Sequence, residues 1–224
     1  INADDLGYTP GINRAICDLL DIHAISTTTA MVALDHVHMP CPDRIAPHLS
    51  RIGLHLQLTA GCPIAVPELG VDGGRFPGKE NIDTLDPALV EREWSAQLER
   101  FKDLYGCLPC RIDSHHGVHT HPAFAALAEE MAARLGVPIR KSSSDPSVVV
   151  DWTGKCLSAE DLVAQLSSAS HQEGGSVEVI CHPGLDTYEL IGIDSWNHLR
   201  AFEHYALMDL SRRWDLLLPD AVLV

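Results

Sequence analysis

The stretch CRIDSHHGVHTHPAFAALAEEMAARLGVPIRK, residues 110–141, decides the fold class of this chain. Residues 110–115 have the pattern of a short strand, and residues 122–136 carry the apolar spacing of a helix that ends at Gly136. Residues 137–141 have the pattern of a second strand. A strand, a helix and a strand in this order are typical of a parallel pair joined by a crossover, so the stretch predicts an α/β protein.

The same alternation runs along most of the chain. We expect further strands at residues 1–3, 27–34, 51–58 and 176–183, and further helices at residues 12–22, 87–106 and 158–171. Gly106 stands where a helix should stop, and Ser158 with Asp161 forms a loose capping pattern. Repeated β-then-α order implies a parallel sheet with helices outside it, either open or closed into a barrel.

Composition limits the size of the fold and the kinds of partner. The 224 residues, 46% of them hydrophobic, suffice for one domain of α/β barrel size or for two small ones. Because no linker or repeat divides the chain, we expect a single domain over residues 1–224. A formal net charge of −15 argues against nucleic acid or an anionic membrane as the main partner, since both reward basic patches. We therefore expect a small neutral or cationic partner.

Cysteine content and hydropathy indicate the compartment. No apolar run is long enough to cross a bilayer. Seven cysteines, an odd number in a chain of this size, indicate reduced thiols and a cytoplasmic protein. Because the chain opens on Ile rather than Met, a short leader before it is left open. A homodimer is one possible assembly.

Two segments are expected to lie outside the alternation of strands and helices. Residues 62–86 are rich in Pro, Gly and Asp and follow a strand end, where α/β enzymes carry substrate-covering loops. A plain solvated connection explains them equally well. Residues 141–155 form the second segment, in which Trp152 either offers an exposed stacking surface for a flat ligand or covers the core.

Acidic and histidine residues collect at the predicted strand ends. Asp4 and Asp5 end the first strand, His55 lies in the strand at residues 51–58, and His115 ends the strand at residues 110–115. The carboxyl ends of parallel strands share one rim of the fold. Two imidazoles and one carboxylate can make a catalytic metal site with a position open for water, while the second acid acts as general base.

Each of these residues also has a plain structural explanation. An Asp after a strand is commonly the N-cap of the next helix, here expected to begin near Thr9. A lone His55 between Leu54 and Leu56 would be a core residue. Asp113 lies two positions before His115 on the same strand face and could orient that imidazole. Because several such residues occur together at the predicted strand ends, a metal site is favoured over these separate structural explanations.

The remaining histidines have less specific explanations. His116 points to the opposite side of its strand, and His119 and His121 fall in the following loop. Each of the three supports a metal ligand, contacts substrate or is solvated. His182 ends the strand at residues 176–183 before a Pro-Gly turn, from where it could protonate a leaving amine.

A competing hypothesis for the function, a thiol redox protein, rests on the sequence CLPC at residues 107–110. Cys107 and Cys110 could form a redox pair, but they precede a strand, whereas a thioredoxin-type pair begins a helix. We interpret them as a fortuitous pair of thiols. Ser114 has no G-x-S-x-G context, and the sequence carries no phosphate-binding glycine loop, so serine hydrolases and nucleotide enzymes are disfavoured.

Four motifs in one order resemble those of a known family. The motifs are NADDLG (residues 2–7), GLHLQLT (53–59), DSHHGVH (113–119) and CHPG (181–184). Together they are similar to the YdjC-like carbohydrate deacetylase family, which includes chitooligosaccharide deacetylases. The resemblance implies a distorted (β/α) barrel, TIM-barrel-like and related to polysaccharide deacetylases, with one divalent metal ion, Mg or Zn.

The resemblance also implies roles for individual residues. Asp5, His55 and His115 become the metal ligands, Asp4 the general base and His182 the general acid. Gly117 stands where related chains often have a third consecutive histidine, so any substrate contact made by that side chain is absent here.

The resulting hypothesis is a metal-dependent hydrolase that removes an acetyl group from an N-acetylated amino sugar or short oligosaccharide such as diacetylchitobiose. Residues expected to bind substrate or to support the ligands are Asp113, His116, His119 and Trp152. Three alternatives stay open. They are hydrolysis of another amide or ester such as a lipid-linked acetylated sugar, a non-catalytic metal- or sugar-binding protein, and a thiol redox protein.

Overall fold

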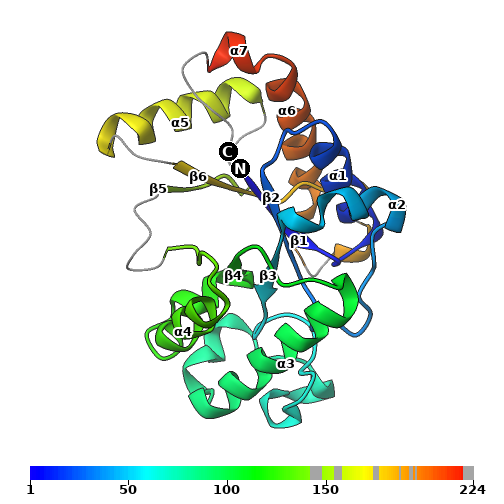
Figure 1. Ribbon diagram of the computed structural model, residues 1–224, viewed down its shortest axis with the longest axis vertical. Helices are drawn as coiled ribbons and strands as arrows, with labels where there is room; N and C mark the ends of the chain where they lie inside the picture. The colour runs from blue at the N-terminus through cyan, green and yellow to red at the C-terminus, as the bar shows by residue number, and fades with distance from the viewer. Residues whose placement is uncertain are drawn as a thin grey trace. The chain divides into compact units, whose positions relative to one another are not determined.

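A computed structural model of the chain describes residues 1–141, 148–153, 158–173, 177–186, 188–191, 194 and 196–218. Its six strands are β1 (Asn2–Leu6), β2 (Thr27–Ala30), β3 (Ile52–Leu56), β4 (Ile112–Ser114), β5 (Val148–Asp151) and β6 (Val177–Cys181). They follow one another in the sheet in the order β4-β3-β2-β1-β6-β5 (Figure 1). The β1–β6, β3–β4 and β5–β6 pairs are parallel, as predicted from the β-then-α order.

Helices follow most of the strands. They are α1 (Pro10–Asp21), α2 (Pro42–Ile45), α3 (Pro87–Tyr105), α4 (Ala125–Leu135), α5 (Ala159–Glu173), α6 (Arg200–Arg212) and α7 (Trp214–Leu217). Thr9 caps α1 by accepting a hydrogen bond from the Ile12 N–H at 3.2 Å, so the explanation of Asp4 or Asp5 as an N-cap is wrong. Gly106 and Gly136 end α3 and α4 with φ of 69° and 68°, which confirms both predicted stops.

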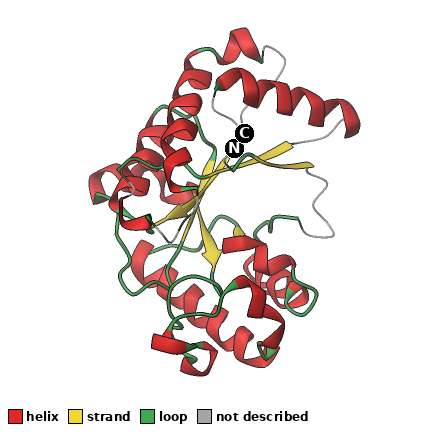
Figure 2. Ribbon diagram, turned by 180° about the vertical axis from the view of Figure 1, so that it is seen from behind, coloured by secondary structure: helices red, strands yellow, loops and turns green. Residues whose placement is uncertain are grey.

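One compact unit comprises residues 1–28, 38–48 and 146–224. Within it α1 packs against β1, α5 lies against β5 and β6, and α6 contacts α5 and α1 (Figures 1 and 2). Ala3, Leu6, Ile16, Leu20 and Leu207 are buried in its core. The apolar face of α1 therefore holds β1, and with it the acids at the end of β1.

A second compact unit comprises residues 29–37 and 49–145. Here β3 pairs with β4, α3 packs against β3, and α4 contacts the turn that follows β4. The rings of Trp94 and Phe124 meet edge to face at 6.1 Å, and both side chains are fully buried. The expectation of one domain over residues 1–224 stays a prediction.

Two predicted elements differ from the structure. Residues 137–141 form a single bridge, between Ile139 and Ile112, instead of a strand, because Gly136 turns the chain and Pro138 has no N–H to donate. The strand β5 lies instead in the segment expected to be a loop, at residues 148–151. The three consecutive β-branched valines at residues 148–150 were the sequence signal that could have predicted this strand. Residues 142–147 and 154–157 of that segment lie outside the described chain.

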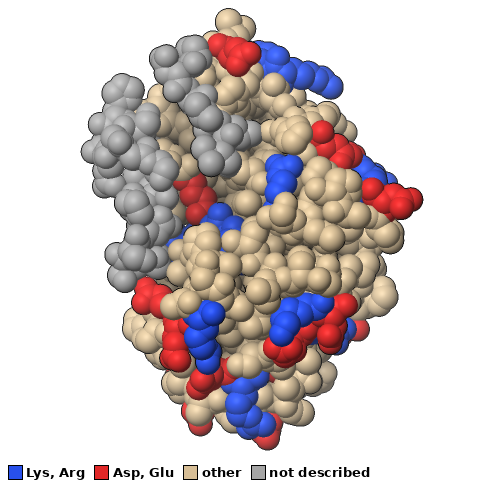
Figure 3. All heavy atoms as spheres, viewed as in Figure 1, with Lys and Arg blue, Asp and Glu red and all other residues tan. Residues whose placement is uncertain are grey.

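The surface of the described residues carries both signs of charge. On the face drawn in Figure 3, Asp and Glu lie beside Lys and Arg, without a continuous basic stripe among the described residues of that face. None of the helices in the described part of the chain is long and apolar enough to span a membrane.

A glycine near the start of α1 makes a very tight backbone contact. A Cβ added at Gly11 would lie 1.5 Å from the Leu185 carbonyl oxygen, and the Gly11 carbonyl accepts a hydrogen bond from the Leu185 N–H at 3.1 Å. The chain segment after β6 therefore docks directly on α1.

Gly11→Ala should force these two segments apart and lower the free energy of unfolding by about 1–3 kcal/mol or more, measured by urea denaturation. Gly106→Asn is the control, because a Cβ at Gly106 meets open space and Asn tolerates a left-handed conformation. It should stay within about 0.5 kcal/mol of the parent. Equal losses in the two variants would contradict the close contact.

Candidate active site

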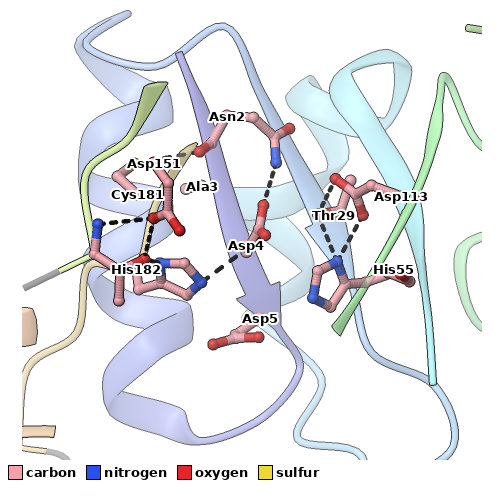
Figure 4. Close-up of polar contacts among 12 residues, drawn as sticks. Asn2, Ala3, Asp4, Asp5, Thr29, His55, Asp113, Asp151, Cys181 and His182 are labelled. Carbon is pink, nitrogen blue, oxygen red and sulfur yellow. Dashed lines mark hydrogen bonds and ion pairs between the residues drawn. The ribbon is translucent and has the colours of Figure 1, made fainter. Parts of the chain in front are cut away.

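The strand β1 ends in two buried acids. Asp4 Oδ1 accepts a 2.6 Å hydrogen bond from Asn2 Nδ2 (Figure 4). Asn2 Oδ1 accepts one of 2.6 Å from Thr27. Asp5 has φ of 74°, in the left-handed region that residues other than glycine rarely adopt. Strain of this kind collects at functional sites, and here it sends two adjacent carboxylates in different directions.

Arg200, the first residue of α6, neutralises Asp5. Its Nη2 lies 2.7 Å from Asp5 Oδ2, and its Nε lies 2.7 Å from Asp194 Oδ2. All three side chains are largely withdrawn from water. Burial alone would lower the pKa of Arg200, but the two carboxylates outweigh it and raise that pKa above its usual value. Asp5 therefore lies beside a guanidinium that stays charged.

His182 follows β6 and is held from three directions. Its Nδ1 lies 2.8 Å from Thr153 Oγ1, which in turn donates to Asp151 at 2.6 Å. Its backbone N–H donates to the buried carboxylate of Glu203. Its Nε2 lies 3.9 Å from Asp4 Oδ2 (Figure 4). Because Thr153 donates to a carboxylate, it accepts from His182 Nδ1–H, which turns Nε2 toward Asp4.

In the other unit, His55 and Asp113 form a pair across β3 and β4. They stand opposite each other in the parallel register, and His55 Nδ1 lies 2.6 Å from Asp113 Oδ1 (Figure 4). Asp113 Oδ2 accepts from Thr29 at 3.1 Å and from Arg140 Nη2 at 2.7 Å. Asp113 thus contacts His55, and its predicted role as the partner of His115 stays a prediction.

His115 and His116 begin the 3-10 turn His115–Thr120 that follows β4. The His115 ring meets the His55 ring edge to face at 5.7 Å and lies 4.0 Å from the His116 ring. His116 has φ of 57°, is exposed, and hydrogen-bonds Thr59 Oγ1 through Nδ1 at 2.9 Å. The left-handed conformation therefore places two imidazoles side by side at the end of β4.

The two later histidines of the cluster hold the surrounding chain. His119 is buried, with Nδ1 2.5 Å from Ser114 Oγ and Nε2 2.8 Å from the Arg140 carbonyl oxygen. Burial lowers its pKa, so it stays neutral. His121 Nε2 lies 2.8 Å from Asp83 Oδ1. His119 thus supports the arginine that binds Asp113, and His121 contacts the segment at residues 62–86.

Trp152 does not offer an exposed ring. Its side chain is fully buried, and its backbone N–H donates to the Ile180 carbonyl at 3.0 Å. The expectation of a stacking surface for substrate is therefore wrong for the described structure, and Trp152 covers the core. Its neighbour Thr153 contacts His182, while Asp151 accepts a hydrogen bond from Thr153.

The cysteines of the CLPC sequence are poor candidates for redox chemistry. Burial raises the pKa of Cys110 to about 11 and also raises the pKa of Cys107. A thiolate is the reactive form of cysteine, and it is disfavoured at both positions at neutral pH. This weighs against a thiol redox protein.

Several supporting residues were missed by the sequence analysis. They are Asn2, Thr29, Arg140, Thr153, Asp194, Arg200 and Glu203. Arg200 and Glu203 lie in a helix that none of the four motifs includes. Arg200 and Glu203 have helical spacing with the buried residues Leu207 and Leu210. Two charged residues on an otherwise apolar helix face were the sequence signal that could have identified them.

Sequence relatives of the chain carry carbohydrate deacetylase names. A family model described as YdjC-like protein matches residues 1–217. A carbohydrate deacetylase of Geobacillus stearothermophilus is 33% identical over 222 residues, which cover 93% of this chain and 88% of that protein. A chitooligosaccharide deacetylase of Citrobacter koseri is 33% identical over 205 residues, 82% of this chain and 80% of its own length.

Solved structures share the fold. An Enterococcus faecalis V583 protein assigned to cellobiose-phosphate cleavage matches with a TM-score of 0.82 at 24% identity, over 96% of this chain and 93% of that one. A Streptococcus mutans CE4 esterase matches with a TM-score of 0.53 at 14% identity, over 96% and 80% of the two chains. The predicted distorted (β/α) barrel is thereby confirmed.

Replacing Arg140 by Met should leave the buried Asp113 carboxylate without its guanidinium. Removing one partner of a buried ion pair typically lowers stability by about 3–5 kcal/mol, which urea denaturation would measure. Arg134→Met is the matched control, because Arg134 is exposed and pairs only loosely with Glu130 at 4.0 Å. Similar stabilities for the two variants would show that the Arg140–Asp113 pair contributes little.

Proposed function

Because the chain belongs to the YdjC-like family, we propose that it is a metal-dependent carbohydrate deacetylase. Its substrate is an N-acetylated amino sugar or short oligosaccharide such as diacetylchitobiose, a class supported by the names of the relatives. The observation that carries the proposal is the pairing of the buried Asp4 carboxylate with His182 Nε2 at 3.9 Å. Such a pair supplies the base and the acid that amide hydrolysis requires.

Asp5, His55 and His115 are the proposed ligands of one divalent metal ion. Asp5 belongs to the first unit and the two histidines to the second, so their assembly around one ion is itself part of the proposal. Both oxygens of Asp113 have partners within the second unit, Oδ1 with His55 and Oδ2 with Arg140 and Thr29, so we assign Asp113 as the support of His55. Asp4 is assigned as the base.

The chemistry of the donors fits a divalent ion. With His55 Nδ1 directed to Asp113, Nε2 is the nitrogen whose lone pair a metal would take. Arg140 keeps Asp113 an acceptor, which fixes that tautomer. One carboxylate and two imidazoles are typical ligands of Zn²⁺, whereas Mg²⁺ prefers oxygen and would retain more water. Both metals are kept as candidates.

The side chains divide the hydrolysis into two proton transfers. A bound divalent ion would polarise the acetyl carbonyl and make water more acidic. Asp4 removes the proton from the attacking water through Oδ2, because its Oδ1 is held by Asn2. His182 then delivers a proton from Nε2 to the departing amine. Thr153, backed by the Asp151 carboxylate, stabilises the cationic imidazole through Nδ1.

The first test is acetate release from diacetylchitobiose by metal-depleted protein, before and after addition of Zn²⁺ or Mg²⁺. Release that appears only with added metal is the expected result. Metal binding without release would favour a different amide or ester substrate, or a non-catalytic metal- or sugar-binding protein. Full activity without metal would contradict the proposed ligands.

Two substitutions separate the ligands from the base. His55→Ala should lose metal and turnover together, with metal content read by atomic absorption. Asp4→Asn should keep its metal and lose about 10²–10⁴-fold in kcat, the usual contribution of a general base. Asp103→Asn, an exposed acid on α3, is the control for removal of one negative charge. An Asp4→Asn variant with most of the parent rate would rule out the base assignment.

A further inference from the structure

A buried carboxylate on α3 binds the backbone of the segment that follows β3. Glu93 is fully buried, and its two carboxylate oxygens accept the N–H groups of Ile64, Ala65 and Val66 at 2.9–3.2 Å. Three consecutive N–H groups directed at one carboxylate fix the local backbone conformation. The segment at residues 62–66 is therefore held by a side chain from another element.

Glu93 also belongs to a longer polar network. Gln97 Nε2 donates to Glu93 Oε1 at 3.1 Å, and Gln97 exchanges two 2.9 Å hydrogen bonds with the backbone of Gln57. The Gln57 side chain in turn binds the backbone of Ala33 and Ala60. Both glutamines are fully buried. Buried polar networks that are satisfied in this way rigidify the chain they bind.

The network reaches His116 and His115, the two imidazoles at the end of β4. Ala60, which Gln57 holds at 2.9 Å, follows Thr59 directly, and Thr59 Oγ1 lies 2.9 Å from His116 Nδ1. The His116 ring is 4.0 Å from the ring of His115. A continuous set of contacts therefore joins α3 to the proposed metal ligand and to the segment at residues 62–66.

We propose that Glu93 is a positioning residue that fixes residues 62–66 as part of the sugar-binding surface beside His115 and His116. The inference rests on the proposed function. Pro63 and Ile64 are half-buried and Ala65 is exposed, so the segment presents a small apolar surface. Such a surface suits the C–H groups of a pyranose ring. The segment is preorganised, so sugar binding requires no ordering of this loop.

The test is Glu93→Gln, which replaces one acceptor oxygen by an NH₂ group that faces other N–H donors. Glu91→Gln, at an exposed position of the same helix, removes the same charge and is the control. In Glu93→Gln, amide hydrogen exchange at residues 64–66 should accelerate about tenfold or more. KM for diacetylchitobiose should rise about fivefold or more, while kcat and metal content stay near those of the parent.

If Glu93→Gln fails to fold, a second variant, Ala65→Trp, tests whether the segment at residues 62–66 contacts the sugar. Ala65→Trp adds a large ring to the exposed tip of the segment and should change KM by about fivefold or more at unchanged unfolding free energy. Ala126→Trp, at an exposed position of α4, should change neither.

The outcomes separate the inference from the proposed function. Unchanged exchange at residues 64–66 in Glu93→Gln would refute the positioning role. Faster exchange with unchanged KM, or an unchanged KM in Ala65→Trp, would refute a sugar-binding role for the segment. If the parent protein itself releases no acetate, the proposed function fails, and the exchange rates alone decide whether Glu93 fixes the segment.

Discussion

The burial of carboxylates is the constraint on which this structure depends. Asp5, Asp113 and Glu93 are all fully withdrawn from water, and each would be expensive to bury as an isolated ion. Each is satisfied differently: by Arg200, by Arg140 together with His55 and Thr29, and by a row of backbone N–H groups. Because each buried acid needs partners from other parts of the sequence, those segments must pack against it. The acids in turn orient the side chains around them.

The parts predictable from sequence are those with local signals. Apolar residues at helical spacing and the glycines at residues 106 and 136 predict α1, α3, α4 and α5, because propensity and capping act over a few residues, whereas α6 is not among the predicted helices. The strand ends with Asp4 and His55 were also recognisable, because ionisable residues are unusual within buried strands. The strand expected at residues 137–141 failed because Pro138 offers no donor, and a short valine run formed β5 instead.

The supporting residues were not predictable for a physical reason. Arg140 and Arg200 are ordinary surface residues by composition, and only tertiary contacts turn them into buried partners of acids. Asp113 illustrates the same limit, since its neighbour in sequence is His115 while its neighbour across the strands is His55. Pairings across a parallel sheet depend on register, which a single sequence does not reveal.

The long separation in sequence between β1 and α6 has a consequence for synthesis. Arg200 binds Asp5, 195 positions earlier, and Glu203 holds the backbone of His182. A ribosome therefore exposes the acid of β1 long before it makes the guanidinium that neutralises it. A chain that stops before residue 200 lacks the guanidinium that neutralises Asp5, so burial of that acid would cost the free energy of an unpaired buried charge.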